Sequence, residues 1–354
     1  MHIIITGGGT GGHVFPALEI AKELLRQKPE ITLSYFGNKD SLEERLARNM
    51  GLHFVGLNTK AIVGKSLKAK IAALFYLKIA VLQCMLLFIK KRPKAVIGVG
   101  GYVSAPVILA SFLLGIKRFL CEQNLIPGMA NKLFGHIAVR VFTSFSQSST
   151  YFPKNKSILT GNPIRQEFFG IERKEVEKPF SILISGGSFG ADFLNQQIPL
   201  ALASIKESCP ELKITHQTGP AKLASTLENY QALGLKAHVV PFIDNMPEAF
   251  LTHDLLISRA GATVMAEIMA SSMPSILVPY RFANAHQKAN ALALASINGA
   301  VLIEEKDNFT KALADTVKEL YQHPNLLFSL GQKAKTLAKP EAAVSIVKSI
   351  FNHF

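Results

Sequence analysis

The chain has 354 residues, of which 48% are hydrophobic and 18% are charged. This length exceeds what one hydrophobic core usually serves, and the composition excludes a disordered protein, so two α/β domains are expected. Thirty-nine Lys and Arg against 25 Asp and Glu give a formal charge of +14, which favours an anionic membrane surface, a polyanion or a phosphorylated substrate. No zinc-finger or RNA-binding motif accompanies the charge, so no nucleic-acid partner is predicted.

The cysteines and the first residues indicate the compartment. Cys84, Cys121 and Cys209 are scattered and lack Cys-x-x-Cys spacing, which predicts neither a disulfide framework nor a metal site and fits a reducing compartment. A glycine-rich segment begins directly after Thr6, which leaves no space for the basic and apolar regions of a signal peptide. We therefore expect a protein that is not exported.

The first predicted elements are an apolar strand over 2–6, a glycine loop at 7–12 and a helix over 16–25. The same order returns in the second half, where a β-rich run over 180–185 leads into glycines at 186–190 and a helical stretch. Two such openings predict an α/β protein with two Rossmann-like, doubly wound domains.

A polar stretch from Gly161 to Pro179 combines turn residues with a run of charges and is the candidate linker. We place the N-terminal domain at 1–162 and the C-terminal domain at 163–339. A last helix over about 340–354 could pack on either domain, because periodicity does not decide between them.

The segment over 71–89 is apolar apart from Lys78 and Gln83. Its length would allow a membrane span, but a lysine near mid-span costs about 2.5–3.5 kcal/mol on the insertion scale. We interpret it as one or two helices with an exposed apolar face able to rest on anionic lipid; a wholly buried core helix is the alternative. Basic residues flank the segment on both sides: Lys65, Lys68, Lys70, Lys90, Lys91 and Arg92.

The first glycine loop contains a literal G-x-G-x-x-G, which makes a nicotinamide oxidoreductase one alternative. That class needs an acidic residue at the end of the second strand, but the strand near 31–36 ends in Gly37-Asn38, with Asp40 already in a loop. The loop instead offers backbone N–H groups to an anion. His13 at its mouth is either a helix-capping residue or a functional one, and we favour function.

The second half offers further candidates. The loop at 186–190 is either a second anion site or a tight turn that needs glycine for its backbone alone. Glu267, in an apolar helical segment, could reach vicinal ribose hydroxyls. No Asp-x-Asp occurs, so we predict no metal, and backbone N–H groups together with a cation such as Arg165 would stabilise the charge of a leaving group.

Taken together, these residues resemble the family of bacterial N-acetylglucosaminyltransferases of peptidoglycan synthesis, which convert lipid I to lipid II. The resemblance spans the chain and rests on many short segments in one order. These are Gly8 to Pro16, Gly100 to Ser104, Glu122-Gln123-Asn124, Gly161 to Arg165, Gly186-Gly187-Ser188, Phe242-Ile243-Asp244, Arg259 with Gly261, Ala262 and Glu267, and His286-Gln287 with Asn290-Ala291.

The resemblance implies a GT-B fold, in which two Rossmann-like domains face each other across a cleft, and an inverting transfer without a cofactor. N-acetylglucosamine would move from UDP-N-acetylglucosamine to the 4-hydroxyl of the muramyl sugar of undecaprenyl-pyrophosphoryl-muramyl-pentapeptide (lipid I), in cell-wall synthesis and hence cell shape and division. It also implies a peripheral protein on the cytoplasmic face of the plasma membrane, the inner membrane of the cell. The N-terminal domain would take the acceptor, and the C-terminal domain the donor.

Site residues follow from the resemblance by position. His13 is the candidate general base, with Glu122 as the alternative. The remaining positions are contacts to the donor's sugar and diphosphate (Thr10, Gly11, Gly12 and Asn124), a contact to the sugar hydroxyls (Gln287), and the uridine-diphosphate subsite (Arg165, Ser188, Ile243, Ala262, Thr263, Val264, Met265, Ala266 and Glu267). Ile243 would offer backbone to uracil and Glu267 would take the ribose.

Two positions depart from the family pattern. Phe189 stands where Gln is common, and Cys121 stands where His usually precedes Glu-Gln-Asn, which puts side-chain polar contacts at these two places in doubt. Three other classes remain open: a non-hydrolysing UDP-N-acetylglucosamine epimerase on the same fold, a nicotinamide oxidoreductase, and a basic membrane adaptor without catalysis.

Overall fold

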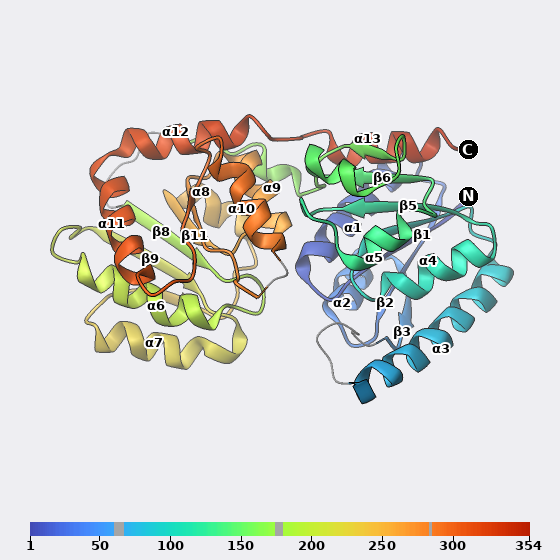
Figure 1. Ribbon diagram of the computed structural model, residues 1–354, viewed down its shortest axis with the longest axis horizontal. Helices are drawn as coiled ribbons and strands as arrows, with labels where there is room; N and C mark the ends of the chain where they lie inside the picture. Colours follow the sequence, from blue (N-terminus) through green and yellow to red (C-terminus); the bar gives the residue numbers. More distant parts are fainter. Residues whose placement is uncertain (60–66, 174–179, 283–284) are drawn as a thin grey trace. The chain divides into compact units, whose positions relative to one another are not determined.

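The computed structural model describes residues 1–59, 67–173, 180–282 and 285–354. The chain forms two compact units (Figure 1). Unit 1 comprises Met1–Ile164 and Lys339–Phe354, and unit 2 comprises Arg165–Ala338. The last helix therefore belongs to unit 1, so that unit is built from both ends of the chain.

Unit 1 contains a seven-stranded sheet in the order β3-β2-β1-β4-β5-β6-β7, and every neighbouring pair is parallel. The direction of strand order reverses between β1 and β4, and open α/β sheets bind ligands at the carboxyl ends of the strands beside such a reversal. The strands are β1 (His2–Gly7), β2 (Thr32–Asn38), β3 (His53–Leu57), β4 (Ala95–Gly100), β5 (Lys117–Glu122), β6 (Arg140–Thr143) and β7 (Ser157–Leu159).

Side chains of β1 alternate between two hydrophobic layers, as the geometry of a strand requires. Ile3 and Ile5 belong to the core cluster with α1 and α13, whereas Ile4 belongs to the cluster with α3 and α4. In Figure 1, α3 runs beside α4, and the two helices are in contact. The helices of unit 1 are α1 (Gly11–Gln27), α2 (Leu42–Asn49), α3 (Leu67–Lys91), α4 (Ser104–Leu113), α5 (Met129–Phe134) and α13 (Ala342–Phe351).

Helix α1 begins at Gly11, although the sequence pattern predicts a start at Pro16. Glycine and proline are poor helix formers, which is why the pattern misses the first turn. The earlier start matters for function, because it places His13 inside the first turn of α1 and not in the loop before it.

The apolar segment predicted over 71–89 is one continuous helix, α3. Val81, Cys84 and Phe88 on one side of α3 are buried in the core of unit 1, where the Phe88 ring meets Phe36 edge-on at 5.7 Å. The segment Ala72–Lys91 is long and apolar enough to cross a membrane, and only 28% of it is buried inside the molecule. Helix α3 therefore has two apolar sides, one in the core and one exposed.

Unit 2 repeats the architecture with a six-stranded parallel sheet in the order β10-β9-β8-β11-β12-β13, reversing between β8 and β11. Its strands are β8 (Phe180–Ser185), β9 (Leu212–Gln217), β10 (His238–Val240), β11 (Leu255–Ser258), β12 (Ser275–Leu277) and β13 (Val301–Leu302). Its helices are α6 (Asp192–Ser204), α7 (Leu223–Ala232), α8 (Met246–Thr252), α9 (Ala262–Ser271), α10 (His286–Ala295), α11 (Phe309–Gln322) and α12 (Pro324–Lys335).

Candidate active site

Two glycine loops meet at the strand-order reversal of unit 1. The first follows β1 and the second follows β4, and the N–H of Gly8 donates to the carbonyl of Gly100 at 3.3 Å. Gly101 has φ +82°, and a Cβ at this position would overlap the carbonyl oxygen of Gly8. Only glycine allows this contact, so the two loops meet backbone to backbone and form one surface at the carboxyl ends of β1 and β4.

The N-terminus of α1 opens on this surface. Thr10 is the N-cap residue, with an extended backbone and no side-chain capping bond, and the first turn carries no acidic residue. Thr10 is exposed, and Gly11 and Gly12 are partly exposed. A helix N-terminus with its positive end directed to a glycine loop favours an anion such as a diphosphate.

His13 lies between the two glycine loops. Its Nδ1 lies 3.3 Å from Thr10 Oγ1, and its ring packs so closely on Gly100 that a Cβ there would lie 2.6 Å from the imidazole Cδ2. Burial lowers the pKa of His13, and a hydrogen bond to the Gly8 backbone opposes this shift only in part. The imidazole is therefore neutral at neutral pH and able to accept a proton.

Glu122, at the end of β5, is buried and organises the loop that follows. Its two carboxylate oxygens accept the backbone N–H groups of Asn124 (2.9 Å) and Gly128 (3.0 Å) and the side-chain amides of Asn124 (3.2 Å) and Asn131 (2.9 Å). Burial raises the pKa of Glu122, and these donors oppose the shift. Four donors therefore fix this carboxylate within its own loop and occupy both of its oxygens.

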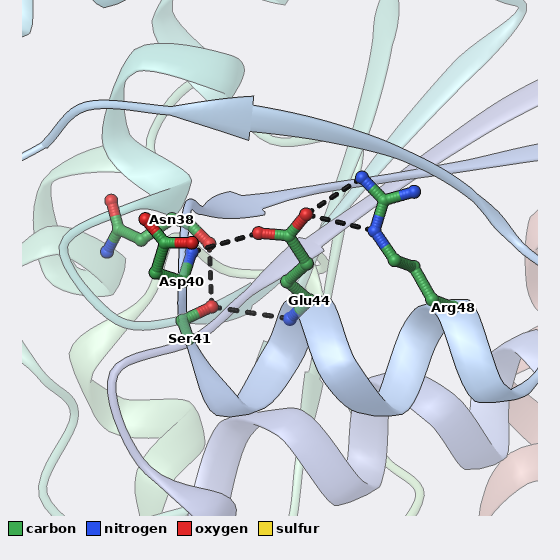
Figure 2. A network of polar contacts seen from close by, with 5 residues as sticks. All are labelled: Asn38, Asp40, Ser41, Glu44 and Arg48. Atoms are coloured by element: carbon green, nitrogen blue, oxygen red, sulfur yellow. Dashed lines mark hydrogen bonds and ion pairs between the residues drawn. The ribbon is translucent and has the colours of Figure 1, made fainter.

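The turn between β2 and α2 is held by a network of polar contacts (Figure 2). Ser41 accepts the N–H of Glu44 at 3.3 Å and donates to the carbonyl of Asn38 at 2.6 Å, and Glu44 pairs with Arg48 at 2.8 Å. This capped helix start holds Asn38, whose side-chain amide donates to the hydroxyl of Tyr102 at 3.1 Å.

One carboxylate near the first loop was not predicted. Glu43 of α2 is 2% exposed, accepts the N–H of Asn38 at 3.2 Å, and lies where a Cβ on Gly8 would overlap it. A dinucleotide site would have its acidic residue at the end of β2, whereas Glu43 comes from the following helix, α2. Because the Glu43 side chain is buried, a ribose cannot reach it, and Glu43 does not support a dinucleotide site.

Unit 2 places a second glycine loop, 186–190, between β8 and α6. Gly190 has φ +75°, and a Cβ there would overlap the carbonyl of Thr218. The loop leaves Ser188 partly exposed and Phe189 75% exposed. Ile243 follows β10 and is half-buried, and its N–H donates to Gln217 Oε1 at 2.9 Å. Because this N–H is already bonded, the backbone carbonyl of Ile243 is the group that we expect to contact a nucleobase.

Glu267 lies in the second turn of α9, and burial raises its pKa to about 7. The charge of Arg165 acts in the opposite direction and favours the carboxylate. Arg165 itself stacks over the ring of Phe168, with its guanidinium carbon 5.3 Å from the ring centroid. Unit 2 thus brings together a carboxylate and an arginine that lie about a hundred residues apart in the chain.

The other predicted positions of α9 divide into two groups. Ala262 and Val264 are partly exposed, whereas Thr263, Met265 and Ala266 are buried inside unit 2. Gln287, at the start of α10, accepts the N–H of Tyr280 at 2.9 Å, which fixes the segment after β12 to that helix.

A buried ion pair beside α9 was also not predicted. Arg259, directly after β11, pairs with Glu305, and both side chains are less than 10% exposed. Arg259 also donates to the carbonyl of Val278 at 3.1 Å. The pairing holds Arg259 against the end of β12, next to the N-terminus of α9.

Two parallel-sheet units with glycine loops at their strand reversals fit the GT-B fold. Comparisons with known proteins give the family. Residues 3–143 match the N-terminal domain of glycosyltransferase family 28, and residues 181–346 match its C-terminal domain. The chain belongs to glycosyltransferase family 28.

Relatives cover nearly the whole chain. A UDP-N-acetylglucosamine--N-acetylmuramyl-(pentapeptide) pyrophosphoryl-undecaprenol N-acetylglucosamine transferase of Syntrophus aciditrophicus is 41% identical over 99% of this chain and 98% of its own length. The protein of the same name from Myxococcus xanthus is 37% identical over 97% of this chain and 90% of its own length.

Solved structures agree. The Acinetobacter baumannii MurG structure superposes with a TM-score of 0.78 at 31% identity, covering 99% of both chains. The UDP-GlcNAc 2-epimerase of Neisseria meningitidis reaches a TM-score of 0.73 at 13% identity, covering 99% of this chain and all of its own, and shares the fold alone. The epimerase alternative therefore has no support beyond the fold, and the family excludes the oxidoreductase and the adaptor as descriptions of this chain.

Proposed function

We propose that this protein transfers N-acetylglucosamine from UDP-N-acetylglucosamine to the 4-hydroxyl of the muramyl sugar of lipid I, which yields lipid II. Two observations carry the proposal: a histidine beside the glycine loops of unit 1 whose lowered pKa leaves it neutral and able to accept a proton, and, within unit 2, a carboxylate whose pKa responds to a nearby arginine. The printed names of relatives at 41% and 37% identity supply the substrates.

Unit 2 binds the donor in this proposal. The carboxylate of Glu267 accepts hydrogen bonds from the ribose hydroxyls, and Arg165 and the loop with Ser188 stabilise the diphosphate. Ile243 offers its carbonyl to the N3–H of uracil. Gln287 contacts the sugar hydroxyls, and the N-terminus of α1 with Thr10, Gly11 and Gly12 adds positive potential on the diphosphate side.

Unit 1 supplies the chemistry on the acceptor. The acceptor 4-hydroxyl oxygen attacks the anomeric carbon of the donor, the bond between that carbon and the β-phosphate oxygen breaks, and UDP leaves with the bonding electrons. His13 takes the hydroxyl proton. Attack from the side opposite the leaving group inverts the anomeric centre. The lowered pKa of His13 keeps its nitrogen available for this proton.

We further propose that unit 1 rests on the cytoplasmic face of the plasma membrane through α3. Leu74, Phe75, Ile79, Leu82, Leu86 and Ile89 are 46–71% exposed, and they recur at helical spacing on the side of α3 away from the core. Lys78 is exposed among them, and Lys90 and Lys91 end the helix. A long helix with an apolar face and basic residues is typical of interfacial binding.

The distribution of charge agrees with this orientation. Unit 1 holds 23 Lys and Arg against 8 Asp and Glu, whereas unit 2 holds 16 against 17. No acidic residue occurs between Glu44 and Glu122, the interval that includes all of α3. The excess positive charge therefore lies entirely in the unit that would contact anionic lipid. Lys65, expected to flank the helix, lies outside the described residues, as do the side chains of Lys68 and Lys70.

One incubation tests the transfer. Labelled UDP-N-acetylglucosamine is mixed with the protein, with and without a lipid I analogue. We expect labelled product and free UDP only when the acceptor is present. Conversion of the nucleotide sugar without acceptor would favour an epimerase, and an unchanged nucleotide sugar in both arms would contradict the proposal.

A further inference from the structure

Gln217, the last residue of β9, connects two segments of unit 2 that the proposed function assigns to the donor. Its side chain is 1% exposed. Its amide nitrogen donates to the carbonyl of Gly187 at 3.0 Å, in the glycine loop, and to Ser185 Oγ at 3.3 Å. Its amide oxygen accepts the N–H of Ile243 at 2.9 Å, in the segment after β10. One buried side chain therefore contacts two segments. They are the glycine loop at 186–190, assigned to the diphosphate (the diphosphate loop), and the backbone at Ile243, assigned to uracil (the base-binding backbone).

The backbone that follows Gln217 is fixed against the same glycine loop. A Cβ at Gly190 would overlap the carbonyl of Thr218, and a Cβ at Gly219 would overlap the carbonyl of Phe189. The side-chain amide of Asn195 donates to the carbonyl of Thr218 at 3.0 Å. The segment after β9 and the loop after β8 thus cannot move independently.

The residue before Gln217 extends the buried network without adding charge. His216 is fully buried, with Nδ1 2.9 Å from the hydroxyl of Tyr230 and Nε2 3.0 Å from Asn195 Oδ1. Burial lowers the pKa of His216 to about 3, so the ring stays neutral over the working range of an enzyme. This cluster therefore serves to hold β9 in place, and Gln217 is the member that reaches the donor segments.

We propose that Gln217 is a positioning residue that sets the distance between the diphosphate loop at 186–190 and the base-binding backbone at Ile243. The inference rests on the proposed function, because that function assigns both segments to the UDP moiety. A glutamine fits because its amide donates on one side and accepts on the other. Methionine matches its length and offers neither group, whereas glutamate keeps the acceptor and loses the donor.

The test compares Gln217→Met and Gln217→Glu with the exposed control Gln231→Glu on α7. The inhibition constants of UDP and of uridine against UDP-N-acetylglucosamine are measured below the melting temperature of each variant. For Gln217→Met we expect both ligands to weaken at least tenfold, since a buried carbonyl and a buried N–H lose their partner. For Gln217→Glu we expect UDP to weaken at least tenfold and uridine no more than about threefold, because the bonds to Gly187 and Ser185 are lost whereas the acceptor for the N–H of Ile243 remains.

The inhibition constants separate positioning from stability, since a lower melting temperature alone would leave both constants unchanged. In Gln217→Glu the ratio of the two constants should change as well. If Gln217→Met does not fold, the ratio in Gln217→Glu decides. UDP inhibition within about twofold of the parent in a folded Gln217 variant would overturn the inference and leave the proposed function intact. A parent protein that is not inhibited by UDP would instead overturn the proposed function, and the inference with it.

Discussion

Glu267 has its pKa raised to about 7 by burial, so its protonation state changes in the range where the enzyme works. Below that pKa the carboxyl is protonated and loses its full acceptor capacity for the ribose hydroxyls. We therefore expect the donor KM of the parent to rise as the pH falls from 8 to 6. Glu267→Gln should weaken donor binding at pH 8 by roughly 1–3 kcal/mol and should show a flat KM over this range.

Calorimetry and initial rates check this prediction, with Glu228→Gln on the exposed side of α7 as the matched control. Donor affinity equal to that of the parent, in a folded Glu267→Gln protein, would remove this residue from the ribose subsite.

His13 has its pKa lowered by burial, so the acidic limb of the kcat profile should lie below the ordinary histidine value of about 6.5. His13→Ala should lower kcat by roughly 100- to 10,000-fold, the range for loss of a general base, and leave the donor KM within a few-fold. The limb should disappear with the residue. Steady-state kinetics against pH measure both effects, and the exposed His136→Ala serves as control.

A kcat within tenfold of the parent, with the acidic limb retained, would make His13 a positioning residue. Glu122 would then return as the candidate base, despite its four hydrogen-bond donors.

At the scale of the element, α3 has an exposed side that is apolar and that no other described residue covers. Replacing Leu82 and Leu86, which are 61% and 71% exposed, by Ser should weaken binding to anionic vesicles and leave UDP binding unchanged. Replacing Lys78, Lys90 and Lys91 by Gln should also weaken it, by about 1 kcal/mol per lysine, in a way that fades at high salt.

Vesicle flotation at low and high salt measures both variants of α3. The pair Leu200→Ser and Leu251→Ser in unit 2 is the matched control, because these leucines are also exposed, at 46% and 57%. Equal flotation of the parent and both α3 variants would show that another face contacts lipid.

At the scale of the molecule, unit 1 depends on the end of the chain. Ile346 of α13 is fully buried in the cluster that contains α1 and β1. Ile346→Ala should therefore lower the free energy of unfolding of unit 1 by about 2–5 kcal/mol. Most of the proposed contacts to UDP come from unit 2, so UDP should still raise the unfolding temperature of unit 2 in this variant.

Calorimetric unfolding with and without UDP separates the two transitions, and Ser345→Ala on the exposed side of α13 is the control. An unchanged unfolding profile for Ile346→Ala would mean that α13 contributes nothing to the stability of unit 1.

Much of this architecture could be read from local patterns. Each glycine loop follows a short apolar run typical of a buried strand and precedes an apolar helical pattern, and such an order indicates strand, turn and helix within about 25 residues. His13 could be named as a candidate for the same reason, because it stands next to the loop in the chain. The start of α1 could not, since its first turn is made of residues that disfavour helices.

The sequence by itself determined two doubly wound sheets, the glycine loops and the family. Only the tertiary structure decided which side chains support those loops. Gln217 meets Gly187 across 30 residues, and Arg259, which follows β11, meets Glu305 in the segment after β13. It also assigned α13 to unit 1 and left one side of α3 exposed. The physical reason is that hydrophobic periodicity reports which side of an element is apolar, whereas the partner of that side is fixed by how distant elements pack.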